Sequence, residues 1–177
     1  IRALPMICAL LAACGEQKGD VAPPPGLDGG DPGDVLPDDG CITINGSGGF
    51  ATIADALDWA DEGDTISLCS GTYSERVVVD KGVTLKGPTS GEPAIISSTE
   101  DTSAVSVRAD GVTLSWLTIV SPSVGVYMEN VDSVSLRVIS FDHTGDTPVR
   151  VKGATNVLLQ SSTFSEREGA MVYVDQG

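Results

Sequence analysis

The chain has 177 residues, enough for one domain with additional segments, and 41% of them are apolar, enough for a packed core. Its 25 acidic residues outweigh 10 basic ones, and the net charge of −15 would repel a phosphate backbone, so nucleic acid is excluded as an expected partner. The 21 glycines and 5% aromatic residues are typical of a turn-rich β protein rather than a helical bundle.

Residues 1–13 are predicted to be a secretory signal peptide. Arg2 supplies the positive end, and the apolar run that follows is too short to cross a bilayer as a helix. The run ends in Leu11-Ala12-Ala13-Cys14, which resembles the bacterial lipobox. The resemblance implies a lipid on Cys14 that anchors the protein to a membrane, and the following Gly15 favours the outer membrane. The alternative is an ordinary signal peptide with an incidental cysteine.

Residues 14–40 are predicted to be the lipidated cysteine and a tether. Positions 15–40 contain 7 Gly, 5 Pro and 6 Asp, with no periodicity and few side chains to bury. Such a composition favours an extended, self-repelling linker over a packed segment. The remaining residues, 41–177, are predicted to form one domain.

Two cysteines, Cys41 and Cys69, remain in the predicted domain. Exported domains favour disulfides, so we expect these two residues to be bonded. The bond would stabilise the domain by about 3–4 kcal/mol. The alternative is a pair of reduced, buried cysteines.

Residues 52–60 have the spacing of an amphipathic helix. Ile53, Ala56, Leu57 and Ala60 fall on one face, and Thr52 is a suitable N-cap with an acid three residues later. A single short helix ahead of a stack of strands is predicted to be a lid, because the end of such a stack exposes unpaired backbone.

Apolar pairs recur along the second half of the chain at a nearly constant interval of about 22 residues between first members. The pairs are Val105/Val107, Val126/Met128, Val149/Val151 and Val172/Val174, in phase with Val112/Leu114, Val134/Leu136 and Val157/Leu159 and with Ile119, Phe141 and Phe164. A fixed short period indicates stacked units whose core is built by neighbours. The last pair has no partner of the second set, so we expect the chain to be the first part of a longer stack.

The segment from Thr52 to Gly87 resembles the opening of pectin-lyase-like right-handed parallel β-helix proteins, including pectinesterases and surface β-helix lipoproteins. The residues that carry this resemblance are Thr52-Ile53, Ala56-Leu57, Ala60, Gly63-Asp64-Thr65-Ile66, Gly71-Thr72-Tyr73-Ser74-Glu75 and Val83-Thr84-Leu85-Lys86-Gly87. The resemblance implies an all-β parallel β-helix over residues 41–177, with about 22–23 residues per coil and a short N-terminal capping helix.

One outward column of this β-helix is a candidate binding surface. It contains Ser106, Tyr127, Arg150 and Tyr173, of which the last three could stack on sugar rings and bind a carboxylate. The alternative is an ordinary solvated sheet face. A second outward column, Thr118, Ser140 and Thr163, is interpreted as plain surface.

The loops before the paired valines gather acidic residues and the only histidine. Asp142, His143 and Asp146 precede one pair, and Glu166 and Glu168 precede the next. Such residues could act as acid and base, or Asp142, Asp146, Glu166 and Glu168 could bind Ca²⁺, the one cofactor considered. The alternative is solvated turns.

A pectinesterase resemblance would place catalytic aspartates at Asp146 and Asp175, whereas Asp142 and His143 are catalytic candidates as members of the acidic loops. The family's Gln-Asp-Thr motif appears only as Gly145-Asp146-Thr147, and Val174-Asp175 begins a second motif that does not continue. The basic residues that a lyase would need do not fall in one column. They are Arg108, Arg137, Arg150, Lys152 and Arg167.

The sequence therefore predicts a lipid-anchored, monomeric protein of the bacterial cell envelope, at the outer membrane and facing the periplasm or the exterior. Its predicted role is non-catalytic binding of a carbohydrate or another partner. The alternative is a pectinesterase- or lyase-like enzyme that modifies polysaccharides and whose catalytic coils are partly missing.

Overall fold

The computed structural model describes residues 40–99, 101–142, 144–145, 147–165 and 170–175. The predicted signal peptide, the lipidation site Cys14 and nearly all of the tether lie outside these residues. So do four members of the predicted acidic corner, His143, Asp146, Glu166 and Glu168.

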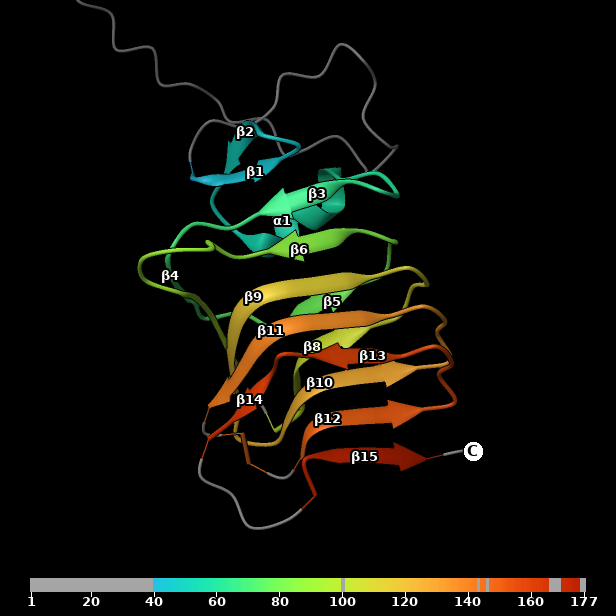
Figure 1. Ribbon diagram of the computed structural model, residues 1–177. Helices are drawn as coiled ribbons and strands as arrows, with labels where there is room; N and C mark the ends of the chain where they lie inside the picture. The colour runs from blue at the N-terminus through green and yellow to red at the C-terminus, as the bar shows by residue number, and fades with distance from the viewer. Residues whose placement is uncertain (1–39, 100, 143, 146, 166–169, 176–177) are drawn as a thin grey trace, which may run out of the picture.

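Short strands stacked in successive coils form most of the described chain (Figure 1). The strands are β1 (Ile42–Ile44), β2 (Ser47–Phe50), β3 (Thr65–Ser67), β4 (Gly71–Tyr73), β5 (Val77–Val79), β6 (Thr84–Lys86), β7 (Ala94–Ser97), β8 (Ser103–Val107), β9 (Thr113–Val120), β10 (Val124–Glu129), β11 (Ser135–Asp142), β12 (Thr147–Lys152), β13 (Leu158–Gln160), β14 (Thr163–Phe164) and β15 (Val172–Asp175). One helix, α1 (Ile53–Trp59), lies near the N-terminal end.

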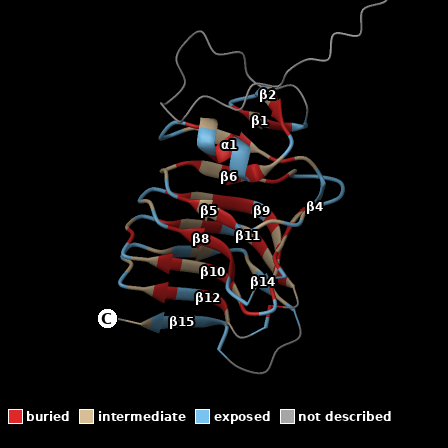
Figure 2. Cartoon of the chain, turned by 180° about the vertical axis from the view of Figure 1, so that it is seen from behind, coloured by how far each residue is buried: buried red, intermediate tan, exposed pale blue. Residues whose placement is uncertain are grey.

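A five-stranded sheet in the order β15-β12-β10-β8-β5 forms one wall of the solenoid. All of its neighbours pair in parallel, with Val105, Val126, Val149 and Val172 in one register and Val107, Met128, Val151 and Val174 in another. This register confirms the repeat of paired apolar residues predicted from the sequence. In the last strand, Val172 and Val174 remain 40% and 58% exposed, whereas their counterparts in β8, β10 and β12 are buried (Figure 2).

A ten-stranded sheet forms the remaining walls of the solenoid. Its parallel register aligns Leu114 with Leu136 and Leu159, as predicted, and aligns Phe141 with Ile119 and Phe164. The rings of Phe141 and Phe164 are stacked 5.1 Å apart. The interior is therefore a continuous apolar core made by side chains from successive coils.

Two earlier coils extend the same columns. Val77 pairs with Val105, and Leu85 pairs with both Ile66 and Leu114. The sequence separation between paired residues is uneven in these coils. From Ile66 to Leu85 it is shorter than in the later coils, and from Leu85 to Leu114 it is longer. The regular period is therefore lost in this part of the stack. The connection between β6 and β7, residues 87–93, contains part of the additional length.

The N-terminal lid combines the predicted helix with a hairpin. Thr52 is the N-cap of α1, and its hydroxyl accepts a hydrogen bond of 3.0 Å from the Asp55 amide, as expected. Strand β1 pairs antiparallel with both β2 and β3, so the segment after Cys41 is not a coil of the parallel stack. Asn45 and Gly46 join β1 to β2 with positive φ angles of 51° and 82°, the chemistry of a type I′ hairpin turn.

Two charged side chains from the coil below hold both ends of α1. The Glu75 carboxylate accepts hydrogen bonds of 3.0 and 3.1 Å from the Ile53 and Ala54 amides at the helix start. At the helix end, the Lys81 ammonium donates to the carbonyl oxygens of residues 57, 58 and 60 at 3.1, 2.9 and 2.7 Å. An anion at the start and a cation at the end both match the helix dipole, so the lid is fixed electrostatically as well as by packing.

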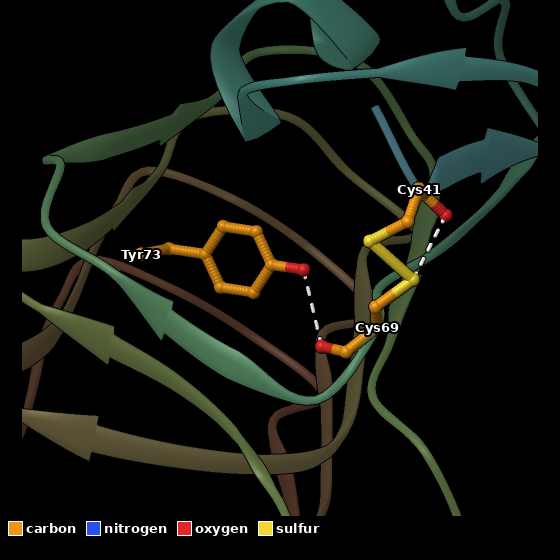
Figure 3. The surroundings of a disulfide bond; sticks show 3 residues. All are labelled: Cys41, Cys69 and Tyr73. Carbon is orange, nitrogen blue, oxygen red and sulfur yellow. Dashed lines mark hydrogen bonds between the residues drawn. A yellow bond between two sulfur atoms is a disulfide. The ribbon is translucent and has the colours of Figure 1, made fainter. Parts of the chain in front are cut away.

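The predicted disulfide between Cys41 and Cys69 is present, with a Cα–Cα distance of 6.0 Å (Figure 3). It joins the start of the lid to the turn between β3 and β4, with a sequence separation of 28 residues. The Tyr73 hydroxyl donates to the Cys69 carbonyl oxygen at 3.1 Å, and burial is the main cause that raises the pKa of this phenol.

Within the described ranges, no helix has the length and apolar character needed to cross a membrane.

The corner that leads from the five-stranded sheet into β11 and β13 is built on Asp132. Its carboxylate accepts hydrogen bonds from the Ser133 hydroxyl at 2.6 Å, from the Asn156 amide at 2.8 Å and from the Thr155 hydroxyl. The bond from Ser133 is the largest cause that lowers the Asp132 pKa, followed by those from Thr155 and Asn156. Residues at this corner, Gly111, Ser133 and Asn156, have φ angles of 70°, 58° and 50°, a left-handed conformation that Gly and Asn accept readily.

Candidate functional site

The predicted outward column lies on the five-stranded sheet and is in register. Tyr127 pairs with Ser106 and Arg150, and Arg150 pairs with Tyr173. Ser106 holds the predicted outward position of β8 but is not accessible, because it is only 1% exposed. Arg76 donates to its hydroxyl at 3.3 Å, and the hydroxyl of Ser103 lies 2.7 Å away. The accessible part of the column is therefore Tyr127, Arg150 and Tyr173, here called the aromatic strip.

The two tyrosines of the aromatic strip differ in their surroundings. Tyr127 is half-buried, and burial is the largest cause that raises its pKa, followed by donation of its hydroxyl to Glu129. Glu129 also accepts from Lys152 at 2.7 Å, and this bond is the main cause that lowers the Glu129 pKa and raises the Lys152 pKa. The Tyr127 hydroxyl, Glu129 and Lys152 thus interact mainly with one another.

The other end of the aromatic strip faces solvent. The Arg150 guanidinium carbon lies 5.5 Å from the centre of the Tyr173 ring, which is 48% exposed. A guanidinium held over a ring keeps its N–H groups at the edge of the stack, where they can bind a carboxylate in a bidentate manner. This pair is the part of the strip that can bind a ligand with both an apolar face and an acidic group.

The acidic corner is only partly described. Asp142 ends β11 and accepts a hydrogen bond of 2.6 Å from the Ser165 hydroxyl. Within the described ranges, no three side chains of the kinds that bind metals come together. The predicted Ca²⁺ site depends mostly on Asp146, Glu166 and Glu168, which lie outside those ranges, so it stays a prediction.

The catalytic candidates Asp142 and Asp175 are not brought together. Asp142 precedes strand β12, whereas Asp175 is in register with Lys152, the last residue of β12. The five steps from Thr147 to Lys152 cover roughly 16 Å of extended strand. These two carboxylates therefore belong to opposite corners of a coil and cannot act on one bond as an acid–base pair.

A concave groove on the ten-stranded sheet is the feature that the sequence interpretation missed. Strands β9 and β11 turn a corner at Trp116 and Val138, and Ser161 continues the same column between β13 and β14. The φ angles of these residues are 57°, 53° and 53°. Left-handed backbone costs roughly 1–2 kcal/mol for a residue with a Cβ, and it is an outlier for bulky or β-branched residues.

This corner groove has a volume of about 290 Å³. Its lining includes Trp116, which is 40% exposed, and the hydroxyl column Thr118, Ser140 and Thr163. The column interpreted as plain surface therefore lines a depression, to which residues 88–91 and 93 of the connection between β6 and β7 also contribute. The spacing of Leu114, Leu117 and Ile119 could have predicted this corner from the sequence. A step of three residues between apolar positions, inside a strand that otherwise alternates, indicates a bend.

Comparisons with known proteins identify the fold. Two solved structures of a pectin methylesterase, one of them a variant, are similar to this chain. One, in complex with hexasaccharide VII, has a TM-score of 0.54, 17% identity, and coverage of 72% of this chain and 54% of that chain. The other, in complex with hexasaccharide IV, has a TM-score of 0.50, 16% identity, and coverage of 68% and 51%.

A curated relative is named a cell surface glycoprotein and comes from Methanothermus fervidus. It is 30% identical over 95 residues, which are 52% of this chain and 16% of the relative. The chain thus spans about half the length of the similar structures and a small part of this relative. No protein-family profile matches the chain. At these identities the likeness establishes the fold alone: the chain is a right-handed parallel β-helix, the fold of these pectin methylesterase structures.

Proposed function

We propose that this chain is a non-catalytic carbohydrate-binding module of the cell envelope. The observation that carries the proposal is the Arg150 guanidinium stacked 5.5 Å from the exposed ring of Tyr173. The pair presents an aromatic surface for the apolar face of a sugar ring and donors for a carboxylate. Its ligand is a short oligosaccharide that contains an acidic sugar.

The charge of the chain limits the length of that ligand. A net charge of −15 repels a long polyanion, whereas an oligosaccharide with few charges experiences mainly the local field of Arg150. Lys152 is already paired with Glu129, so Arg150 is the basic group of the aromatic strip that lies beside the exposed Tyr173 ring. We therefore expect affinity for an acidic hexasaccharide to depend on Arg150 more than on total charge.

The comparisons support the carbohydrate and envelope parts of the proposal. The similar structures hold hexasaccharides, and the curated relative is named as a cell surface protein. A lipid on Cys14, predicted from the sequence, would place the module at a membrane through a tether of about 26 residues. The incomplete motifs favour binding over hydrolysis, because Gly145 stands where the pectinesterase motif has Gln and the motif begun by Val174-Asp175 does not continue.

The test measures calorimetric binding of hexagalacturonic acid and of its fully methyl-esterified form to the 177-residue chain. We expect preference for the acid form. Arg150→Lys keeps the charge but removes the planar fork, and it should weaken binding by about tenfold, the effect of one charge-assisted hydrogen bond. Arg137→Ala removes an exposed charge from the other sheet and is the matched control, with no expected change.

Unchanged binding in Arg150→Lys together with weaker binding in Arg137→Ala would show that only the overall charge matters, and the proposed site would be wrong. Release of methanol or of unsaturated products from pectin by the parent chain would contradict the non-catalytic assignment. That result would favour the polysaccharide-modifying enzyme predicted as the alternative.

A further inference from the structure

The corner groove differs chemically from the aromatic strip. None of the residues that line it carries a charge, in a chain with 25 acidic and 10 basic residues. Its surface instead combines the Trp116 indole, the apolar side chain of Val138 and three hydroxyl groups on Thr118, Ser140 and Thr163. An uncharged, concave surface of this kind excludes a ligand that is recognised through a carboxylate or a phosphate.

The arrangement of the groove matches a linear neutral glycan. The hydroxyl groups come from the same register position in consecutive coils, so they repeat at the strand spacing of about 4.8 Å. Thr163 donates to Ser140 at 3.3 Å, which orients part of this row. Sugar hydroxyls bind to such a row, while the apolar face of the ring lies against the exposed indole.

The backbone conformation of the groove corner is unfavourable for the residues that occupy it. At the other left-handed corners of these coils the residues with positive φ are small: Asn130, Gly153 and Asn156, for which the cost is low, and Ser133. Here Trp116 and Val138 adopt it, although Asn or Gly would build the same bend more easily. Backbone outliers that a sequence retains are concentrated at functional sites, and this one directs a large aromatic side chain into a groove.

We propose that the corner groove is a second carbohydrate site, specific for uncharged oligosaccharides, with Trp116 as its stacking residue. It lies on the ten-stranded sheet, whereas the aromatic strip lies on the five-stranded sheet. The two sites therefore bind independently and select ligands of different charge. This inference shares the carbohydrate class with the proposed function but does not depend on Arg150 or Tyr173.

The test uses neutral hexasaccharides of glucose, mannose, galactose and N-acetylglucosamine, titrated to millimolar concentration into the 177-residue chain. The chain contains two tryptophans, so a Trp59→Phe background makes the fluorescence change report on Trp116 alone. We expect at least one neutral ligand to shift the Trp116 emission. Trp116→Asn should weaken its binding by about tenfold in calorimetry, the size of one aromatic stacking contact.

Trp116→Asn also separates binding from folding, because Asn tolerates left-handed backbone better than Trp does. Its thermal midpoint should equal or exceed that of the parent while affinity falls. Tyr173→Ala should leave neutral binding unchanged, and Trp116→Asn should leave binding of hexagalacturonic acid unchanged. The inference is overturned if none of the four neutral ligands binds, or if Trp116→Asn binds them as tightly as the parent. Either result leaves the Arg150 test intact.

Discussion

Replacing Lys81 by Met should loosen the helical lid, because the ammonium group donates to three carbonyl oxygens at the end of α1. A hydrogen bond to a charged group contributes about 1.5–3 kcal/mol, and a cation at a helix C-terminus adds about 0.3–1 kcal/mol. Lys81 is half-buried, and water can replace it at the more exposed carbonyl of Asp58. We therefore expect a loss of about 2 kcal/mol rather than the sum of three bonds.

Thermal and urea unfolding followed by circular dichroism measures this loss. For a domain of this size, about 2 kcal/mol corresponds to a fall in Tm of roughly 8 °C. Lys86→Met is the matched control, because it removes the same charge from the outer face of β6 without affecting the three hydrogen bonds. Hydrogen exchange at the Ala60 amide, which donates to Ala56 at 3.0 Å, reports on opening of the lid itself.

Similar changes in Lys81→Met and Lys86→Met would refute the reasoning, since they would reflect net charge alone. Unchanged Ala60 exchange in Lys81→Met would refute it too.

The disulfide, the Asp132 corner and Gly125 each allow a further test. Replacing Cys41 and Cys69 by Ser should lower stability by about 3.5 kcal/mol, the chain-entropy value for a loop of this length, and reductant should then have no further effect on urea unfolding. Asp132, whose pKa is lowered from 3.8 by its hydrogen bonds, stabilises the fold above that pH and loses this contribution as the pH falls. Asp132→Asn should therefore flatten the stability profile below about pH 4 in an acid titration, and an unchanged profile would contradict this assignment. Gly125→Ala should cost about 1–3 kcal/mol in urea unfolding, because the new Cβ would lie 2.5 Å from the Pro148 carbonyl oxygen.

The regular coils could be predicted because their period is visible in the sequence. Val105, Val126 and Val149 occupy one buried column at nearly equal steps, and each also fits the two-residue alternation of a strand. The first coils could not be found in the same way, because the step from Leu85 to Leu114 is longer than the regular period. A long connection changes the period without changing the stack, so only three-dimensional pairing reveals these coils.

The candidate sites were predictable to different degrees. The aromatic strip follows from the repeat, but the burial of Ser106 depends on Arg76, which reaches it from a preceding coil. The corner groove depends on left-handed backbone angles at Trp116 and Val138. The conformational preferences of Trp and Val disfavour these angles, so the sequence alone does not predict them. Asn45-Gly46, in contrast, is a strong local hairpin signal, and it indicates antiparallel pairing before the parallel coils begin.

The antiparallel β1–β2 hairpin and the disulfide-linked lid close one end of the rod independently of how many coils follow. Duplication of one repeat unit in the regular region would therefore lengthen the rod by one strand spacing, about 4.8 Å, without disturbing the closed end. Because the aromatic strip and the hydroxyl column are both built from equivalent positions in successive coils, each inserted unit would also add one position to each surface. Duplication of repeat units in the gene can thus change the length of the solenoid and the number of ligand contacts on each surface, while the start of the domain stays constant.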